Sequence, residues 1–162
     1  MEEKNSMNIG IIIYSQTGNT FSVAQKLKKK FITEGHLVDL EKIKVVGKVT
    51  PRVKNIKFEN LPDVGQYDAL VFGSPVQAFS LSSPMSAYLA QVTSLESKKV
   101  ALLATQQFPY PWMGGNRTIG QMKKLCESKG AFVTGSGIIN WSKSNREQRI
   151  VEVIDKLSKL FL

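Results

Sequence analysis

The chain has 162 residues, enough for one domain with a full core, and its 42% hydrophobic and 22% charged residues are typical of globular proteins. Its formal net charge is +9, no apolar run is long enough to cross a membrane, and residues 1–6 lack the apolar region of a signal peptide. The single cysteine, Cys126, excludes an internal disulfide and indicates a cytoplasmic protein.

Apolar runs alternate with helical spacings along the chain, which predicts a parallel sheet with helices on both faces. Strands are expected at Asn8–Tyr14, His36–Ile43, Tyr67–Gly73, Lys99–Thr105 and Ala131–Ile139. The second of these is expected at an edge because charged residues interrupt it. Helices are expected from the first loop to about Glu34, after an N-cap at Ser83, before Gly130, and after a capping box of Ser144 and Glu147.

Residues 44–66 show no helical period and contain two glycines and two prolines, which predicts a short turn or an irregular loop where a helix would complete the pattern. Residues 1–7 are expected to form a loose terminus, and residues 8–162 a single domain.

A loop of hydroxyl and amide side chains follows the first strand and leads into an amphipathic helix. Main-chain N–H groups at a helix start are unpaired, and the helix dipole adds positive charge, so this loop favours an anion. The absence of lysine and of the GxxxxGK[ST] spacing excludes a nucleoside-triphosphate loop. The alternative is an ordinary turn capped by Thr17 or Thr20. The expected binding residues are Ser15, Gln16, Thr17, Gly18, Asn19 and Thr20.

The segment Tyr-Ser-x-Thr-Gly-Asn-Thr of residues 14–20 resembles the phosphate loop of the flavodoxin-like family, which binds flavin mononucleotide (FMN). The loop after the third strand, residues 73–78, resembles the family segment Gly-[Ser/Thr]-Pro-Val-x-Ala, although it lacks a glycine between Val76 and Phe79. The resemblance implies an α/β fold with three layers and a doubly wound, five-stranded parallel sheet of order 2-1-3-4-5. It also implies FMN as the cofactor.

Two loops are expected at the flavin ring. The resemblance places the loop after the third strand against the ring, through Ser74, Pro75, Val76, Gln77, Ala78 and Phe79. The loop after the fourth strand is rich in aromatic side chains, and so large an apolar surface is expected to pack on a ligand or on another protein surface. A flat flavin ring is one candidate. Its expected residues are Thr105, Gln106, Gln107, Phe108, Tyr110, Trp112, Gly114 and Gly115. The alternatives are turn chemistry with Phe79 in the core, a partner surface, or packing on the sheet edge.

We therefore expect an FMN-binding redox protein in which the flavin carries the electrons and no side chain is catalytic. The alternatives are an NAD(P)H- or quinone-dependent FMN reductase and a flavin-free interaction module that keeps the fold. His36, the only histidine, has no cysteine or acid at ligand spacing, so no metal is expected.

The segment Lys42–Lys57 holds six basic residues and no acid. It is interpreted either as a solvated surface or as a docking patch for an acidic redox partner protein. Nucleic acid is disfavoured as the partner because aromatic residues are not interleaved with these charges.

Overall fold

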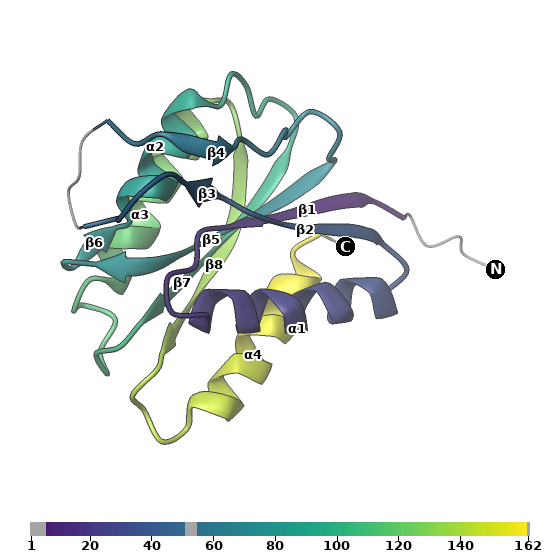
Figure 1. The fold of residues 1–162 in the computed structure, drawn as a ribbon. Helices are drawn as coiled ribbons and strands as arrows, with labels where there is room; N and C mark the ends of the chain where they lie inside the picture. Colours follow the sequence, from purple (N-terminus) through teal and green to yellow (C-terminus); the bar gives the residue numbers. More distant parts are fainter. Residues whose placement is uncertain (1–5, 51–54, 162) are drawn as a thin grey trace.

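The computed structural model describes residues 6–50 and 55–161. Its main strands are β1 (Asn8–Ile13), β2 (Leu37–Lys42), β5 (Ala69–Gln77), β7 (Lys99–Gln106) and β8 (Phe132–Asn140). Neighbouring strands run parallel in the order β2-β1-β5-β7-β8, the order predicted as 2-1-3-4-5 (Figure 1). The predicted α/β sheet and the edge position of its second strand are therefore confirmed.

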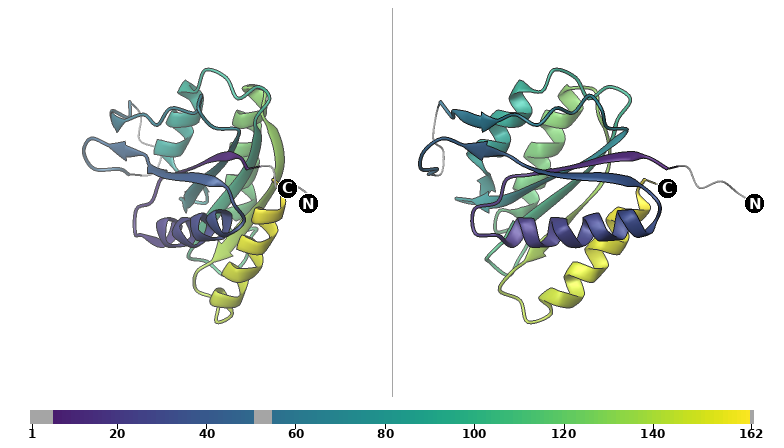
Figure 2. Two further views of the ribbon diagram at one scale, coloured as in Figure 1. Left: turned by 90° about the vertical axis from the view of Figure 1, so that its right-hand side faces the viewer. Right: turned by 45° about the vertical axis from the view of Figure 1, so that its right-hand side comes forward.

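Helices cover both faces of this sheet and complete the three layers. α1 (Asn19–Thr33) and α4 (Arg146–Lys159) pack side by side on one face, whereas α2 (Ser83–Gln91) and α3 (Gly115–Ser128) lie on the other (Figure 2). After the exposed Asn8, β1 is buried and apolar because Ile11 and Ile13 enter the core beneath α1 and α4, whereas Ile12 enters the core beneath α2 and α3. Among the helices of the described residues, none is sufficiently long and apolar to span a bilayer.

Gly10 allows an aromatic ring to pack directly on the central strand β1. A Cβ atom at this position would lie 2.6 Å from the ring of Tyr67. The Tyr67 hydroxyl then reaches β2, where it donates to Glu41 Oε2 at 2.7 Å. One ring thus connects β1 and β2 on the face that carries α2, and it does so because position 10 has no side chain.

Along the chain, β2 and β5 are connected by a segment that contains a two-stranded ribbon, where the sequence predicted a turn or an irregular loop. β3 (Lys44–Val45) and β4 (Phe58–Asn60) are antiparallel, with Val45 opposite Phe58. The prediction that no helix forms there is confirmed, but the regular pairing was not anticipated. The Asn60 side chain strengthens it by accepting from the Lys44 N–H and donating to the Lys42 carbonyl. Such pairing depends on contacts between distant residues and leaves little trace in local periodicity.

Two predicted helix starts are wrong by one residue. Ser82, not Ser83, caps α2, because its Oγ accepts from the Met85 N–H at 3.4 Å. α4 begins at Arg146 after Asn145, and the capping box predicted from Ser144 and Glu147 does not form. Glu147 instead contacts Lys26 Nζ at 3.4 Å, so a tertiary ion pair has replaced the local cap.

The outer strand β8 is partly shielded by cationic side chains of α4. Lys156 Nζ donates to the Ser136 carbonyl at 2.7 Å, and Arg149 Nε donates to the Ile138 carbonyl at 3.3 Å. Unpaired main-chain groups of an outer strand can recruit a strand from another chain, and charged side chains oppose this.

Candidate functional site

The candidate site lies at the carboxyl ends of β1, β5 and β7, where the strand order reverses between β1 and β5. The start of α1 and the short strand β6 (Ser80–Leu81) lie at this end of the sheet (Figure 1). Three segments meet there: residues 14–20 follow β1, residues 73–81 begin in the last part of β5, and residues 105–115 begin at the end of β7. They are the segments from which the sequence predicted cofactor contacts.

The first segment presents unpaired main-chain donors at the start of α1. Gly18 precedes the helix in a left-handed conformation with φ of 94°, and its carbonyl accepts from the Ser22 N–H at 2.9 Å. In the part of the chain that the structure describes, the N–H groups of residues 16–20 donate to no acceptor. A Cβ on Gly18 would meet nothing within 4 Å, so the space above this residue is open. Free N–H groups, the helix dipole and open space together suit an anion.

The hydroxyl groups of this segment have different roles. Thr20 is 1% exposed, and its Oγ1 lies 2.8 Å from the Thr105 Oγ1, so this hydroxyl is engaged inside the fold. Ser15 Oγ accepts from the Phe21 N–H at 3.3 Å. The Thr17 and Asn19 side chains form no hydrogen bond within the described residues. Thr20 therefore faces the loop with its N–H alone, whereas Thr17 and Asn19 keep free side-chain donors.

The second segment is a hairpin, which corrects the prediction that β5 ends at Gly73. Ser74 and Pro75 continue β5 beside Ala104 and Thr105 of β7, and Val76 and Gln77 pair antiparallel with Leu81 and Ser80 of β6. The central residues of the two-residue turn are Ala78 and Phe79, with φ of 47° and 62°. Non-glycine residues reach this conformation at a cost of about 1–2 kcal/mol each. The turn therefore stores strain, as functional loops often do.

Phe79 lies on the surface and meets an aromatic residue of the third segment. It is 51% exposed, so the alternative that placed it in the core is wrong. Its ring stacks on Phe108, with centroids 5.4 Å apart and an interplanar angle of 12°. Gly114 makes this approach possible, since a Cβ there would lie 2.7 Å from the Phe79 Cα.

Hydrogen bonds from the Gln106 side chain fix the third segment against the end of the sheet. The Gln106 Nε2 lies 2.8 Å from the Phe108 carbonyl, 2.6 Å from the Tyr110 carbonyl and 2.7 Å from the Asn140 Oδ1, and its two protons can serve two of these acceptors at a time. Tyr110 and Trp112 form a second stacked pair, with centroids 5.9 Å apart. Trp112 is 73% exposed, so the pair presents a flat aromatic surface to solvent.

The remaining expected residues occupy positions around these contacts. Gln16 joins the first segment to the second, because its Oε1 accepts from the Gln77 Nε2 at 2.9 Å. Gln107 is exposed, and Gly115 is the buried first residue of α3, where a Cβ would lie 2.6 Å from the Gln106 Oε1. In the described part of the chain, no three His, Cys, Asp or Glu side chains gather as a metal site requires.

Sequence reasoning missed Lys42 as a neighbour of the first segment. Lys42 ends β2, and its Nζ lies 3.6 Å above the Phe21 ring in the first turn of α1. This cation adds positive potential beside a loop that has no lysine of its own. The signal in the sequence was the position of Lys42 near the end of the second predicted strand, because neighbouring parallel strands end at the same edge of a sheet; the pairing of Lys42 with Ile13 fixes the contact.

No protein-family model matches the chain, and no curated protein matches it by sequence. Solved structures do match it. Flavodoxin 2 from Bacillus cereus is 19% identical with a TM-score of 0.69, over 95% of this chain and 97% of that one. A flavoprotein in complex with FMN from Lactobacillus acidophilus NCFM is 17% identical with a TM-score of 0.64, over 91% and 99% of the two chains. The Trp repressor binding protein from Bacillus subtilis is 16% identical with a TM-score of 0.64, over 94% and 98%. The fold is thus flavodoxin-like, as the sequence motifs predicted.

Proposed function

We propose that residues 8–162 form one domain that binds a single FMN at the candidate site and carries electrons to a partner protein. The open loop at residues 16–20, with its unpaired N–H groups, is the observation that carries this proposal. It has the donor chemistry that a phosphate monoester requires. Flavodoxin and FMN-complex structures of the same fold support the choice of ligand.

The residues of the site fit FMN in two separate ways. The phosphate would be held by the N–H groups of residues 16–20 and by the side chains of Thr17 and Asn19, with Lys42 nearby as a source of positive potential. The isoalloxazine ring would find aromatic surface on Phe79 and Phe108. When bound, FMN would supply the redox chemistry, so the protein contributes binding, orientation and electrostatics.

Visible spectroscopy and titration test this proposal. The purified protein, reconstituted with FMN, should show a bound flavin spectrum that bleaches with dithionite. Thr17→Ala should weaken FMN about tenfold to a hundredfold, because a hydrogen bond to a charged group contributes about 1.5–3 kcal/mol. Riboflavin, which lacks the phosphate, should bind the parent and the variant equally. Equal losses of affinity for both ligands would refute the phosphate assignment. If the protein binds no flavin, the alternative of a flavin-free interaction module is favoured.

A second candidate function is an NAD(P)H- or quinone-dependent FMN reductase. The exposed pair of Tyr110 and Trp112 favours it, because a second planar substrate could stack there, and Lys143 Nζ lies 5.4 Å from the Tyr110 ring centroid as a cation for an anionic group. Steady oxidation of NADPH by the FMN-loaded protein with a quinone as acceptor would select this activity over simple electron carriage.

We place the protein in the cytoplasm. Cys126 is buried and free, which fits a compartment that keeps thiols reduced. Recovery of the protein from a periplasmic or secreted fraction of its source cells would contradict this.

A further inference from the structure

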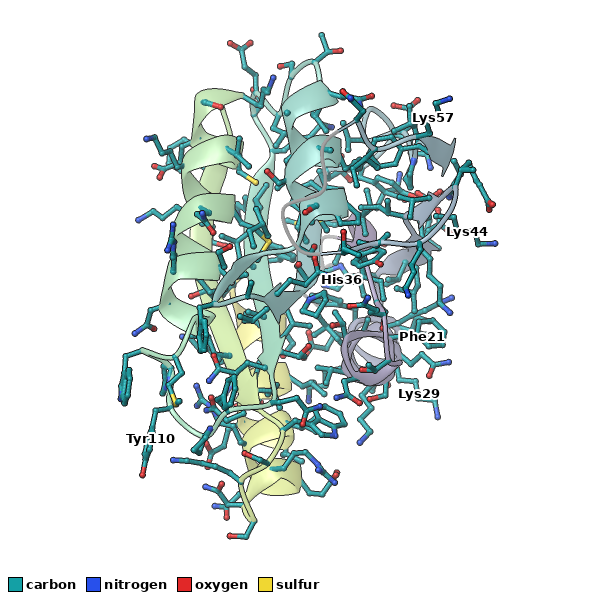
Figure 3. The ribbon with its side chains drawn as sticks, turned by 60° about the vertical axis from the view of Figure 1, so that its left-hand side comes forward. Phe21, Lys29, His36, Lys44, Lys57 and Tyr110 are labelled. Atoms are coloured by element: carbon teal, nitrogen blue, oxygen red, sulfur yellow. The ribbon has the colours of Figure 1, made fainter. Side chains whose placement is uncertain are left out.

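Six lysines on α1, on β2 and on the segment that follows β2 make up what we call the basic face, and α1 packs beside β2. Two of them lie in strands β2 and β3, two lie in the residues beside the ribbon, and two lie in α1: Lys42, Lys44, Lys48, Lys57, Lys28 and Lys29. In the described part of the chain, none of these ammonium groups forms an ion pair. Figure 3 shows Lys29, Phe21, Lys44 and Lys57 along one side of the molecule. Arg52 and Lys54, the other two basic residues of the segment Lys42–Lys57, lie outside the described residues.

The pleat of the ribbon separates its core contacts from its cations. Val45 and Phe58 are half-buried and pack against the core beneath α2 and α3. The alternate positions Lys44, Val46 and Lys57 point outward, and Val46 is 58% exposed. Docking surfaces commonly have an exposed apolar residue bordered by charges. Among the described residues of this segment, Glu59 is the acid on this outer side, where Lys44 and Lys57 are the cations.

A chain of contacts links the basic face to the candidate site. Lys42 Nζ lies over the Phe21 ring, and the Phe21 N–H donates to the Ser15 Oγ in the first segment. Figure 3 shows Tyr110 of the third segment on the side of the molecule opposite Phe21 and Lys29. A protein bound to the basic face would therefore lie beside the first segment, residues 14–20, and would leave the third segment, residues 105–115, uncovered.

We propose that the basic face docks an acidic surface of the protein that exchanges electrons with the bound flavin. This inference rests on the proposed function for the presence of the flavin. Six ammonium groups without ion pairs repel one another, and an approaching array of carboxylates relieves that repulsion and steers the encounter. Electron-transfer complexes are small and short-lived, so steering contributes more to them than a large apolar interface would.

The aromatic residues of this surface argue against nucleic acid as the occupant. Stacking of bases needs free ring faces. The Phe21 ring is covered by Lys42, and Phe58 is half-buried in the core. An acidic protein needs only the exposed ammonium groups and the apolar centre at Val46.

The test uses a 20-residue poly-L-glutamate peptide as the acidic probe and the full chain loaded with FMN. Binding should weaken steeply between 20 mM and 200 mM salt, because exposed charges are screened within about 10 Å at 0.1 M. The variant Lys44→Glu, Lys48→Glu, Lys57→Glu should weaken the probe about tenfold or more. The matched control Lys99→Glu, Lys123→Glu, Lys124→Glu carries the same charge change on β7 and α3 and should lose less than about threefold.

Several outcomes would overturn this inference. Equal losses in the two triple variants would show that only net charge matters. Amide chemical shifts that move on α3 rather than on α1 and the ribbon would place the probe elsewhere. Tighter binding of a 20-base-pair DNA duplex than of the peptide at the same salt would assign the face to nucleic acid. A set of three Lys→Gln changes at positions 44, 48 and 57, with thermal melts of every variant, separates lost charge from lost folding.

FMN titration of the same proteins distinguishes this inference from the proposed function. Both triple variants should bind FMN within about threefold of the parent, because the anion loop is unchanged. If the parent binds no FMN yet the ribbon variant alone loses the peptide, the proposed cofactor fails and the docking face stands. If FMN binds and the peptide does not discriminate, the docking face fails and the cofactor stands.

Discussion

Replacing Thr20 by valine should damage folding and spare phosphate binding. The Thr20 hydroxyl is buried against the Thr105 hydroxyl at 2.8 Å, and Thr105 is itself 3% exposed. Valine keeps the volume but leaves the Thr105 hydroxyl without this partner, which costs about 1–3 kcal/mol. For a chain of this size, each kcal/mol lowers the melting temperature by about 2–4 °C, so a fall of about 2–12 °C is expected.

The FMN affinity of Thr20→Val should change by less than about threefold, because the group that faces the loop is the N–H of residue 20, which valine retains. Thr17→Ala is the matched contrast. Thr17 is exposed and its side chain has no hydrogen bond in the described chain, so its loss should leave the melting temperature within about 1 °C of the parent. FMN affinity should nevertheless fall about tenfold or more.

Circular dichroism melts without flavin, together with fluorescence titrations of FMN and riboflavin, measure both effects. A buried role for the Thr20 hydroxyl is refuted if Thr20→Val has the melting temperature of the parent, binds FMN more weakly and binds riboflavin unchanged. That result would turn the Thr20 hydroxyl towards the phosphate and away from Thr105. A variant that loses both ligands in proportion to its stability would leave the assignment intact, since folding and binding are then linked.

Gly10→Ala should lower the free energy of unfolding in urea by about 1–3 kcal/mol, because its Cβ would lie 2.6 Å from the Tyr67 ring. Gly120→Ala, with nothing within 4 Å, should raise that free energy by about 0.5–1 kcal/mol, and a shift of the same sign in both would contradict the packing. Burial raises the pKa of the Cys126 thiol to about 12, so Ellman's reagent at pH 8 should label only the unfolded chain. Since the unfolded thiol ionises from about pH 8.5, the Cys126 contribution to stability should fall as pH rises above that value, and Cys126→Ala should flatten the slope. Ala78→Asn should raise the melting temperature, because asparagine tolerates the φ of 47° better than alanine; an unchanged or lower value would show that the turn is not strained.

The parallel sheet was predictable because each central strand is buried on both faces, whereas its order 2-1-3-4-5 followed from the resemblance of the loops to the flavodoxin-like family. A β-branched apolar run such as Ile11–Ile13 is typical of a strand covered on two sides, and the alternation of such runs with helical periods indicates a parallel sheet. The anion loop was predictable for a similar reason. Strand, hydroxyl-rich loop and helix are consecutive in the chain, so local sequence specifies their geometry.

The features that were not predicted depend on residues distant in sequence. The partner of Thr20 is Thr105, 85 positions away, and the approach of Lys42 to Phe21 requires the β1–β2 register. The continuation of β5 past Gly73 was hidden because Ser-Pro is typical of a loop, whereas β7 supplies a neighbour that keeps the segment extended. Local propensity gives way in such places to pairing and packing.

Because Lys156 and Arg149 donate to carbonyls of β8, α4 protects the edge of the sheet as well as covering its face. A molecule whose C-terminal helix detaches, through truncation or a transient local opening, loses both donors to the Ser136 and Ile138 carbonyls at once. The exposed strand would then be a template for a strand of a second copy, and the product would be an oligomer built by strand addition rather than a loosened monomer. With the helix in place, these two donors oppose edge-to-edge pairing through β8.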